Sequence, residues 1–367
     1  MAAKQLRHGF TTGSSAAAAA KAALIYMSGR ENLKEVEIPL PMGGRLTIHV
    51  ECTEKVGEGV RATVIKDAGD DPDVTHHAKI SCTVCLSPGT MESDITIEGG
   101  RGVGKVTRPG LSVPVGESAI NPVPRRQIEE AIREGLEETG LEGAVSVVIE
   151  VENGEKIAQK TLNPRLGIVG GISILGTRGT VKPFSHEAYR DTISISMDVA
   201  RAGGLNTVAL STGGRSEGFL KRECPVLPVA SFIQVADFFS FSLEEAVKRG
   251  FRDILYACFF GKLVKMAQGN PYTHAKKSRV DFCQLSGWCA SLGMAKEMVL
   301  KVAGANTVRE VLGLILEDDR KFRVIADLIQ KVLIAAREFA GPGPDITYYL
   351  FDFNGRLLVR QKSTGRG

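Results

Sequence analysis

The sequence has neither a strong excess of one charge nor a long apolar run. Its 46 basic and 42 acidic residues leave a net charge of +4, which is too small to indicate a duplex-binding protein, because such proteins present a strongly basic face. No stretch reaches the roughly 18 uninterrupted apolar residues that a membrane-spanning helix needs. We therefore expect neither nucleic acid nor a membrane as a partner.

Cysteine is sparse and irregularly spaced. The 7 cysteines lie in apolar segments without the regular spacing of a secreted disulfide framework, so we expect reduced thiols. Cys82 and Cys85 form a CxxC pair, but no second pair follows at zinc spacing, and the run ISCTVCL alternates as a strand does. A strand is the favoured interpretation, a metal or redox pair is the alternative, and we predict no resident metal site.

A secretory signal is also missing. Basic residues precede an alanine run near the N-terminus, but the polar residues 11–15 interrupt the apolar segment and Lys21 divides the alanines. We therefore predict a cytoplasmic protein. Ser14 or Ser15 is expected to cap a helix over residues 16–27, in which alanine supplies helix propensity and permits close packing.

Residues 1–162 are typical of an α+β domain with a mixed sheet. Gly43 and Gly44 separate two strand patterns and predict a hairpin. Pro124 near the start and Gly140 past the end bound an amphipathic helix. Further strands are predicted at 60–66, 93–100 and 144–152.

Residues 163–345 show a different pattern and predict a Rossmann-like α/β domain. Nearly continuous apolar runs, typical of buried parallel strands, alternate there with helical patterns. Residues 278–340 are expected to be helical throughout, and residues 346–367 to form a C-terminal hairpin and tail. The predicted strands are 171–176, 206–213 and 253–259, and the predicted helices between them are 186–202, 231–249 and 261–268.

The loop over residues 97–107 nearly matches a phosphate-binding loop. Gly99, Gly104 and Lys105 stand at the right spacing, but Val106 takes the place of the Ser or Thr whose hydroxyl binds magnesium. A glycine-rich connection is the favoured interpretation, and phosphate binding is the alternative.

Small residues follow two of the predicted parallel strands. Ligands of open α/β sheets bind at the carboxyl ends of strands, where the loops 176–179 and 211–215 would meet. This arrangement favours a nucleoside-type site over plain turns, although the GxGxxG fingerprint is absent. The residues predicted to bind the nucleoside cofactor are Gly171, Ser173, Gly176, Thr177 and Gly213.

Four aspartates crowd residues 67–73, and His76 follows them. Asx turns and helix caps account for some of these carboxylates, but four exceed what turns require. Crowding favours a site in which one carboxyl is held protonated or meets a cation. The spacing does not fit a calcium loop of the EF-hand type. We predict catalytic roles for Asp70, Asp71 and His76.

A basic run without any acid covers residues 260–279. Such a run is either a solvated face or, beside a ligand-binding edge, a site for an anionic substrate held by charge-assisted hydrogen bonds. His274 within it is either a proton donor or a packed imidazole.

Six strings occur in order along residues 1–185: HGFTTGSSAAAAAKAAL, EIPLP, KDAGDDPDVTH, GVGKVTRPGL, INPVPR and NPRLGIVGGISILGT. Together they resemble the cobalt-precorrin-5B C1-methyltransferases of anaerobic cobalamin biosynthesis, the CbiD family. The resemblance implies two domains, the first like the second domain of ribosomal protein S5 and the second Rossmann-like. It also implies methyl transfer from S-adenosylmethionine to carbon 1 of cobalt-precorrin-5B, giving cobalt-precorrin-6A, with cobalt present only as part of the substrate.

The resemblance directs the remaining assignments. The partners it implies are a small-molecule tetrapyrrole and other enzymes of the cobalamin pathway. The aspartates would then accept the ribose diol, manage protons on the ring, or orient arginines in a salt-bridge frame. A GHMP-like small-molecule phosphotransferase and a non-catalytic corrinoid-binding protein are the competing functions. The residues predicted to bind the tetrapyrrole are Thr11, Thr12, Arg165, Arg178, Lys262, Lys265 and His274.

Overall fold

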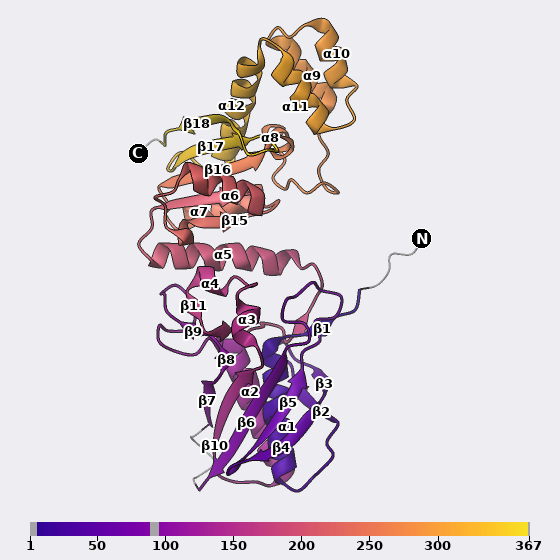
Figure 1. Cartoon of the computed structure of the whole chain (residues 1–367), viewed down its shortest axis with the longest axis vertical. Helices are drawn as coiled ribbons and strands as arrows, with labels where there is room; N and C mark the ends of the chain where they lie inside the picture. The colour runs from indigo at the N-terminus through magenta and orange to yellow at the C-terminus, as the bar shows by residue number, and fades with distance from the viewer. Residues whose placement is uncertain (1–5, 89–94, 366–367) are drawn as a thin grey trace. The chain divides into compact units, whose positions relative to one another are not determined.

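The computed structural model describes residues 6–88 and 95–365 and divides into two compact units (Figure 1). Unit 1 is Met1–His186 and unit 2 is Glu187–Gly367. Each unit combines helices with a β-sheet and has its own hydrophobic core, which agrees with the predicted mixture of α and β structure. Within the described ranges, no helix has both the length and the apolar character that crossing a membrane requires.

The division falls later in the chain than the predicted boundary at residue 163. The segment that follows residue 163 completes unit 1, because three of its short strands pair with earlier strands of that unit. The prediction that residues 171–176 belong to the parallel sheet of unit 2 is wrong, since Gly171 and Ile172 pair with β8 and Ile174 bridges to Ile120, all within unit 1. The three pairs are β1 (Gly9–Phe10) with β13 (Thr180–Val181), β8 (Gly102–Val103) with β12 (Gly171–Ile172), and β9 (Lys105–Val106) with β11 (Ile168–Val169).

A five-stranded sheet in the order β4-β5-β6-β10-β7 forms the body of unit 1. Ile80, Cys82 and Val84 alternate with more exposed residues on β6, so the CxxC run is a strand, as predicted. The predicted hairpin around Gly43 and Gly44 is confirmed. The strand predicted over 93–100 is found as β7, although residues 93 and 94 lie outside the described part of the chain. The elements are β2 (Glu35–Pro39), β3 (Arg45–His49), β4 (Cys52–Val56), β5 (Gly59–Ile65), β6 (Lys79–Ser87), β7 (Ile95–Gly99), β10 (Ala144–Val151), α3 (Gly154–Ala158) and α4 (Asn163–Leu166).

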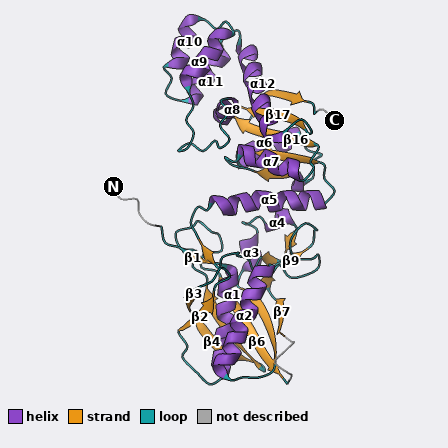
Figure 2. Ribbon diagram, turned by 180° about the vertical axis from the view of Figure 1, so that it is seen from behind, coloured by secondary structure: helices purple, strands orange, loops and turns teal. Residues whose placement is uncertain are grey.

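Two long helices, α1 (Thr12–Met27) and α2 (Pro122–Thr139), lie side by side on one face of this sheet (Figure 2). The alanines of α1 are 0% exposed, because the sheet, α2 and the β2–β3 hairpin surround the helix. Small side chains allow this close approach on every side. The predicted helix is confirmed, but it begins at Thr12 and not at residue 16, because Thr11, and not a serine, is the cap and accepts the hydrogen bond of the Ser14 amide at 3.2 Å.

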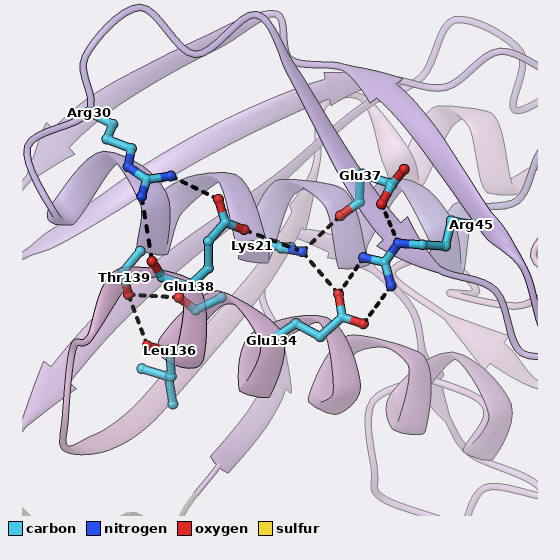
Figure 3. A network of polar contacts seen from close by, with 9 residues as sticks. Lys21, Arg30, Glu37, Arg45, Glu134, Leu136, Glu138 and Thr139 are labelled. Atoms are coloured by element: carbon cyan, nitrogen blue, oxygen red, sulfur yellow. Dashed lines mark hydrogen bonds and ion pairs between the residues drawn. The ribbon is translucent and has the colours of Figure 1, made fainter.

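A charged network joins α1, α2 and the hairpin (Figure 3). Lys21 is only 4% exposed, and its ammonium donates to the Glu134 carboxylate and to the Glu37 carbonyl, each at 2.9 Å. Arg45 makes a two-pronged contact with Glu134 at 2.8 and 2.9 Å. Hydrogen bonds from Arg45 and then from Lys21 lower the pKa of Glu134 to about 2. The network therefore stabilises unit 1 through a carboxylate that must be ionised.

Unit 2 contains a five-stranded sheet in the order β15-β14-β16-β17-β18. The first four strands are parallel, and β18 is antiparallel at the edge. Leu220 of α6 packs on one face, whereas α5, α7, α8 and α12 contribute to the core on the other face. The strands are β14 (Thr207–Ser211), β15 (Phe232–Gln234), β16 (Asp253–Phe259), β17 (Asp345–Phe351) and β18 (Leu357–Ser363).

Most predicted helices of unit 2 are confirmed, with three corrections. Residues 278–340 are not helical throughout, because loops divide this region into four separate helices. The helix expected over 231–249 is shorter, because residues 232–234 add a strand beside β14. The C-terminal hairpin exists, but β17 joins the parallel sheet beside β16, and so residues 346–367 are not a separate part. The helices are α5 (His186–Ala202), α6 (Gly214–Glu223), α7 (Phe239–Lys248), α8 (Phe260–Ala267), α9 (Phe282–Ser291), α10 (Lys296–Ala303), α11 (Val308–Glu317) and α12 (Lys321–Ala340), with a 3-10 turn at Val229–Ser231.

The charged network predicts a pH-dependent contribution to stability. Replacement of Glu134 by Gln should lower the free energy of unfolding at pH 7 by about 1 kcal/mol, because it leaves Lys21 and Arg45 without their shared carboxylate. Since the folded pKa of about 2 lies below the unfolded value of 4.5, this contribution is complete above pH 4.5 and is lost as the pH falls towards 2.

Calorimetric unfolding of Glu134→Gln and of the control Glu130→Gln should distinguish the network from a general effect of helix charge. Glu130 lies one turn earlier on α2 and is exposed. We expect a lower melting temperature only for Glu134→Gln, with a difference from the native chain that narrows below pH 4.5. An equal effect of both substitutions would contradict the proposed network.

Candidate functional site

The carboxyl ends of β14 and β16 form a candidate ligand-binding edge of unit 2. The chain passes from β14 to β15 on one side and then returns to β16 on the other side, so the strand order reverses at β14. The connecting helices α6 and α7 cover opposite faces of the sheet. Open parallel sheets bind their ligands at such a reversal, outside the carboxyl ends of the strands.

Small and polar groups surround this edge. Ser211 ends β14 with 0% exposure, and its hydroxyl has no hydrogen-bond partner within the described part of the chain. Gly213 follows in an extended conformation, with no atom within 4 Å of the place where a Cβ would stand. The chain then enters α6, where Ser216 donates to the Gly213 carbonyl at 2.9 Å. The edge thus has both open space and a buried polar group that a ligand can satisfy.

An aromatic pair with two arginines borders the same edge. Phe259 ends β16 and stacks on Phe353, with ring centroids 5.6 Å apart and an interplanar angle of 13°. The Arg215 guanidinium lies 5.6 Å from the Phe259 ring, and that of Arg309 lies 5.3 Å from the Phe353 ring. Sequence reasoning placed Arg215 at this edge only as the last residue of loop 211–215, and it missed the other three as site residues. Phe353 lies beside Phe259 because β16 pairs with β17, a pairing that no local pattern shows.

The predicted substrate lysines are engaged with the protein. Lys262 forms an ion pair with Asp237 and donates to the Thr273 hydroxyl at 3.3 Å. Lys265 donates to the Thr273 carbonyl at 3.0 Å. Burial, and then the positive charge of Lys265, lowers the pKa of Lys262 to about 8. This value is still above neutral pH and the Asp237 carboxylate favours the charged form, so the ammonium remains available for its ion pair.

His274 follows this anchored loop and is packed on one side. Its ring stacks on Tyr272 with centroids 6.0 Å apart, and its Nδ1 accepts the Lys276 amide at 3.2 Å. The second ring nitrogen is therefore the one available to a ligand.

The predicted cofactor residues are not all in one unit. Gly213 belongs to unit 2, whereas the other four belong to unit 1, where close packing accounts for three of them. A Cβ on Gly171 would lie 2.2 Å from a carbonyl oxygen of β8, and one on Gly176 would lie 2.5 Å from Thr11. The Ser173 hydroxyl donates to Asn163 at 3.2 Å.

The loop after β12 has exposed polar side chains and contacts the start of α1. Thr177 and Arg178 are exposed. Thr12 accepts the Leu175 amide at 2.8 Å and lies 3.1 Å from the Ser173 carbonyl, so its hydroxyl holds this loop to the helix. The hydroxyls of both predicted threonines therefore have structural partners, Thr11 as the helix cap and Thr12 on the loop.

The aspartate loop holds the N-terminal arm of unit 1. Asp67 pairs with the Arg7 side chain, and Asp70 accepts the Arg7 amide at 2.8 Å. The guanidinium of Arg7 lowers the pKa of Asp67. Asp71 accepts the amide of Phe184 at 2.9 Å. The carboxylates thus order three segments of unit 1, which matches the salt-bridge frame among the three predicted roles.

The rest of the loop is anchored by a buried ion pair. Lys66, 1% exposed, pairs with Asp73 at 2.7 Å. His76 accepts the Ala68 amide through Nδ1 at 3.0 Å. The predicted Arg165 lies elsewhere in unit 1, half-buried on α4. No cluster of three or more metal-ligating side chains occurs among residues 6–88 and 95–365.

The near-match to a phosphate-binding loop does not have the required structure. A phosphate-binding loop leads from a strand into a helix, whose N-terminus receives the phosphates. Here Lys105 begins β9, which pairs with β11, and no helix follows it directly. The glycine-rich connection is confirmed, because a Cβ on Gly104 would lie 2.4 Å from Ile168.

Comparison with known proteins shows which protein family the chain resembles. The CbiD family model matches residues 1–183, and the model of the CbiD C-terminal domain matches residues 272–362. A relative from Nitratidesulfovibrio vulgaris, named cobalt-precorrin-5B C(1)-methyltransferase, is 47% identical over 360 residues, which cover 96% of this chain and 92% of the relative. A relative of the same name from Thermus thermophilus is 43% identical over 357 residues, which cover 97% of this chain and 94% of the relative.

A solved structure is also similar. It is described as the crystal structure of a cobalamin biosynthesis protein (CbiD) from Archaeoglobus fulgidus; it is 30% identical, covers 70% of this chain and 78% of its own, and has a TM-score of 0.39. The family models and the near-complete coverage of the curated relatives agree with the resemblance carried by the six strings. The chain belongs to the CbiD family.

Proposed function

We propose that this chain is an S-adenosylmethionine-dependent methyltransferase that methylates carbon 1 of cobalt-precorrin-5B and gives cobalt-precorrin-6A. The observation that carries the proposal is the 47% identity to a relative of that name along 96% of this chain. The proposal includes the finer architecture: a unit 1 like the second domain of ribosomal protein S5 and a Rossmann-like unit 2, the latter supported by the strand order of its sheet.

In this proposal, the nucleoside of the donor binds at the carboxyl ends of β14 and β16. Ser211 offers a buried hydroxyl there, and Gly213 leaves room for a ligand close to the backbone. The bound donor supplies a methyl group on a sulfonium, whose carbon–sulfur bond breaks with the electron pair returning to sulfur as the bond to the ring carbon forms. The protein does not need to generate a strong nucleophile, so its task is to position the donor and exclude water.

The other predicted residues take supporting places in the proposal. Asp70, Asp71 and His76 act through the frame that orders the N-terminal arm, while exposed Thr177 and Arg178 remain proposed ligand contacts. Lys262 and Lys265 fix the Thr273 loop, which presents His274. Arg165 is proposed to contribute to the tetrapyrrole-binding surface of unit 1, and Thr11 and Thr12 to shape that surface through the helix start and the loop that their hydroxyls hold.

The activity is tested with cobalt-precorrin-5B and methyl-labelled S-adenosylmethionine under anaerobic conditions. We expect the product to gain one methyl group, which carbon NMR places at carbon 1. Heat-denatured protein serves as the control. Tight binding of the tetrapyrrole without label in the product would contradict the proposal and favour the non-catalytic alternative.

The donor site is tested by two matched glycine substitutions. Gly213→Val should weaken S-adenosylmethionine binding about tenfold, or ~1.4 kcal/mol, because the side chain fills space reserved for the ligand while the extended backbone accepts it. Gly218→Val, on α6 and equally free of close neighbours, should leave the affinity unchanged.

Calorimetric titration measures both affinities, and thermal unfolding checks that both variants fold. Native affinity in a folded Gly213→Val variant would exclude this edge as the donor site. Loss of affinity in both variants would instead point to a general disturbance of α6.

A further inference from the structure

In the described part of the chain, cationic side chains near the candidate ligand-binding edge of unit 2 include two lysines with acidic partners and two arginines without them. Lys262 is paired with Asp237, and Lys221 is paired with Glu217. Arg215 and Arg309 are exposed, and within the described ranges neither has a carboxylate at ion-pair distance. A guanidinium is charged at every physiological pH, so this pair of arginines carries two permanent positive charges without acidic partners.

The two arginines are held by aromatic faces and by the backbone. Arg215 and Arg309 lie 5.6 and 5.3 Å from the rings of the stacked phenylalanines, within the ~6 Å of a cation–π contact. Arg215 also donates to the Phe353 carbonyl. A guanidinium that contacts an aromatic face can direct its N–H edge away from the ring, where it can bind a carboxylate with two parallel hydrogen bonds.

The position of this cluster relates it to the ligand-binding edge. Ser211 pairs in register with Ala257, and the side chain of Phe259 lies on the same sheet face as that of Ala257 because side chains alternate along a strand. The buried hydroxyl without a partner and the aromatic pair therefore share one face at the carboxyl end of the sheet. The carboxylates of two nearby acidic residues accept backbone hydrogen bonds and do not pair with the arginines. Asp352 accepts the amides of its own turn, and Glu310 accepts the Asn306 amide.

We propose that Arg215 and Arg309, supported by Phe259 and Phe353, determine substrate specificity by binding the carboxylate arms of a cyclic tetrapyrrole. The inference rests on the proposed function, because it names the part of that substrate which unit 2 recognises. It moves the main anion-binding role from Lys262, whose ammonium is paired with a carboxylate, to two guanidiniums that have no carboxylate partner among the described residues.

The test uses uroporphyrin, a soluble tetrapyrrole octacarboxylate, and measures its affinity by fluorescence quenching. Arg309→Gln should weaken binding about tenfold, since it removes one charge-assisted contact. Arg215→Lys keeps the charge but loses the planar fork, and should weaken binding to a smaller extent. Arg252→Gln is the control, because Arg252 is exposed just before the amino end of β16, at the opposite edge of the same sheet.

Two further measurements separate the carboxylate arms from other anions. The octamethyl ester of uroporphyrin, dispersed in detergent, should bind the native chain and the Arg309→Gln variant with equal affinity, because the ester has no carboxylates for the arginine to bind. S-adenosylmethionine also carries a carboxylate, so its affinity is measured in each variant and should not change. An affinity loss for the donor alone would overturn the proposal and assign the arginines to the donor.

Kinetics then distinguish this inference from the proposed function. With cobalt-precorrin-5B, Arg309→Gln should raise KM for the tetrapyrrole about tenfold and leave kcat nearly unchanged. Active native enzyme with unaltered KM and uroporphyrin affinity in Arg309→Gln would overturn the inference alone. Native protein without methyl transfer, but with arginine-dependent uroporphyrin binding, would overturn the proposed function alone.

Discussion

The parallel pairing of β14 with β16 is the interaction on which the candidate site depends. This pairing sets Ser211 opposite Ala257, and so brings the glycine loop after β14 beside the aromatic residue that ends β16. The pairing of β16 with β17 extends the same edge to Phe351, two residues before Phe353. These residues come from three segments of the chain, and the hydrogen-bond register of the sheet makes the three segments neighbours.

Charge is distributed in unit 1 and unit 2 by the same rule. In unit 1, Lys21 and Lys66 are buried and each has a carboxylate partner, because an unpaired buried ammonium costs several kcal/mol, on the order of the penalty for an isolated buried ion. The crowded aspartates follow this rule, since arginine, lysine and amide donors use their oxygens. A charge without such a partner is therefore informative only where it is exposed beside a ligand edge, as Arg215 and Arg309 are.

Local patterns in the sequence predict elements well, and pairings poorly. The alanine-rich helix, the hairpin at Gly43 and Gly44, and the helix that ends at Gly140 depend on neighbouring residues, and all three are confirmed. The three residues of β15 are too few to show the alternation of buried and exposed residues that is typical of a strand, so the predicted helix included them. The residues of the candidate site were harder to predict than the elements of the fold, because contacting residues such as Phe259 and Phe353 are far apart in the sequence.

The glycines show why the residues predicted to bind the cofactor have two different environments in the structure. Glycine is used both where a ligand approaches the backbone and where another backbone does, and the two uses look identical in a sequence. The structure separates them, because a Cβ at Gly171 or Gly176 meets protein atoms, whereas one at Gly213 meets none. Glycine at Gly213 is not needed for the extended backbone or for packing within unit 2. Open space alone does not identify a ligand site, since Gly218 on α6 is equally open. Gly213 differs because it lies directly after β14 at the candidate edge, and we therefore propose it, among the five residues predicted to bind the cofactor, as the one that a ligand approaches.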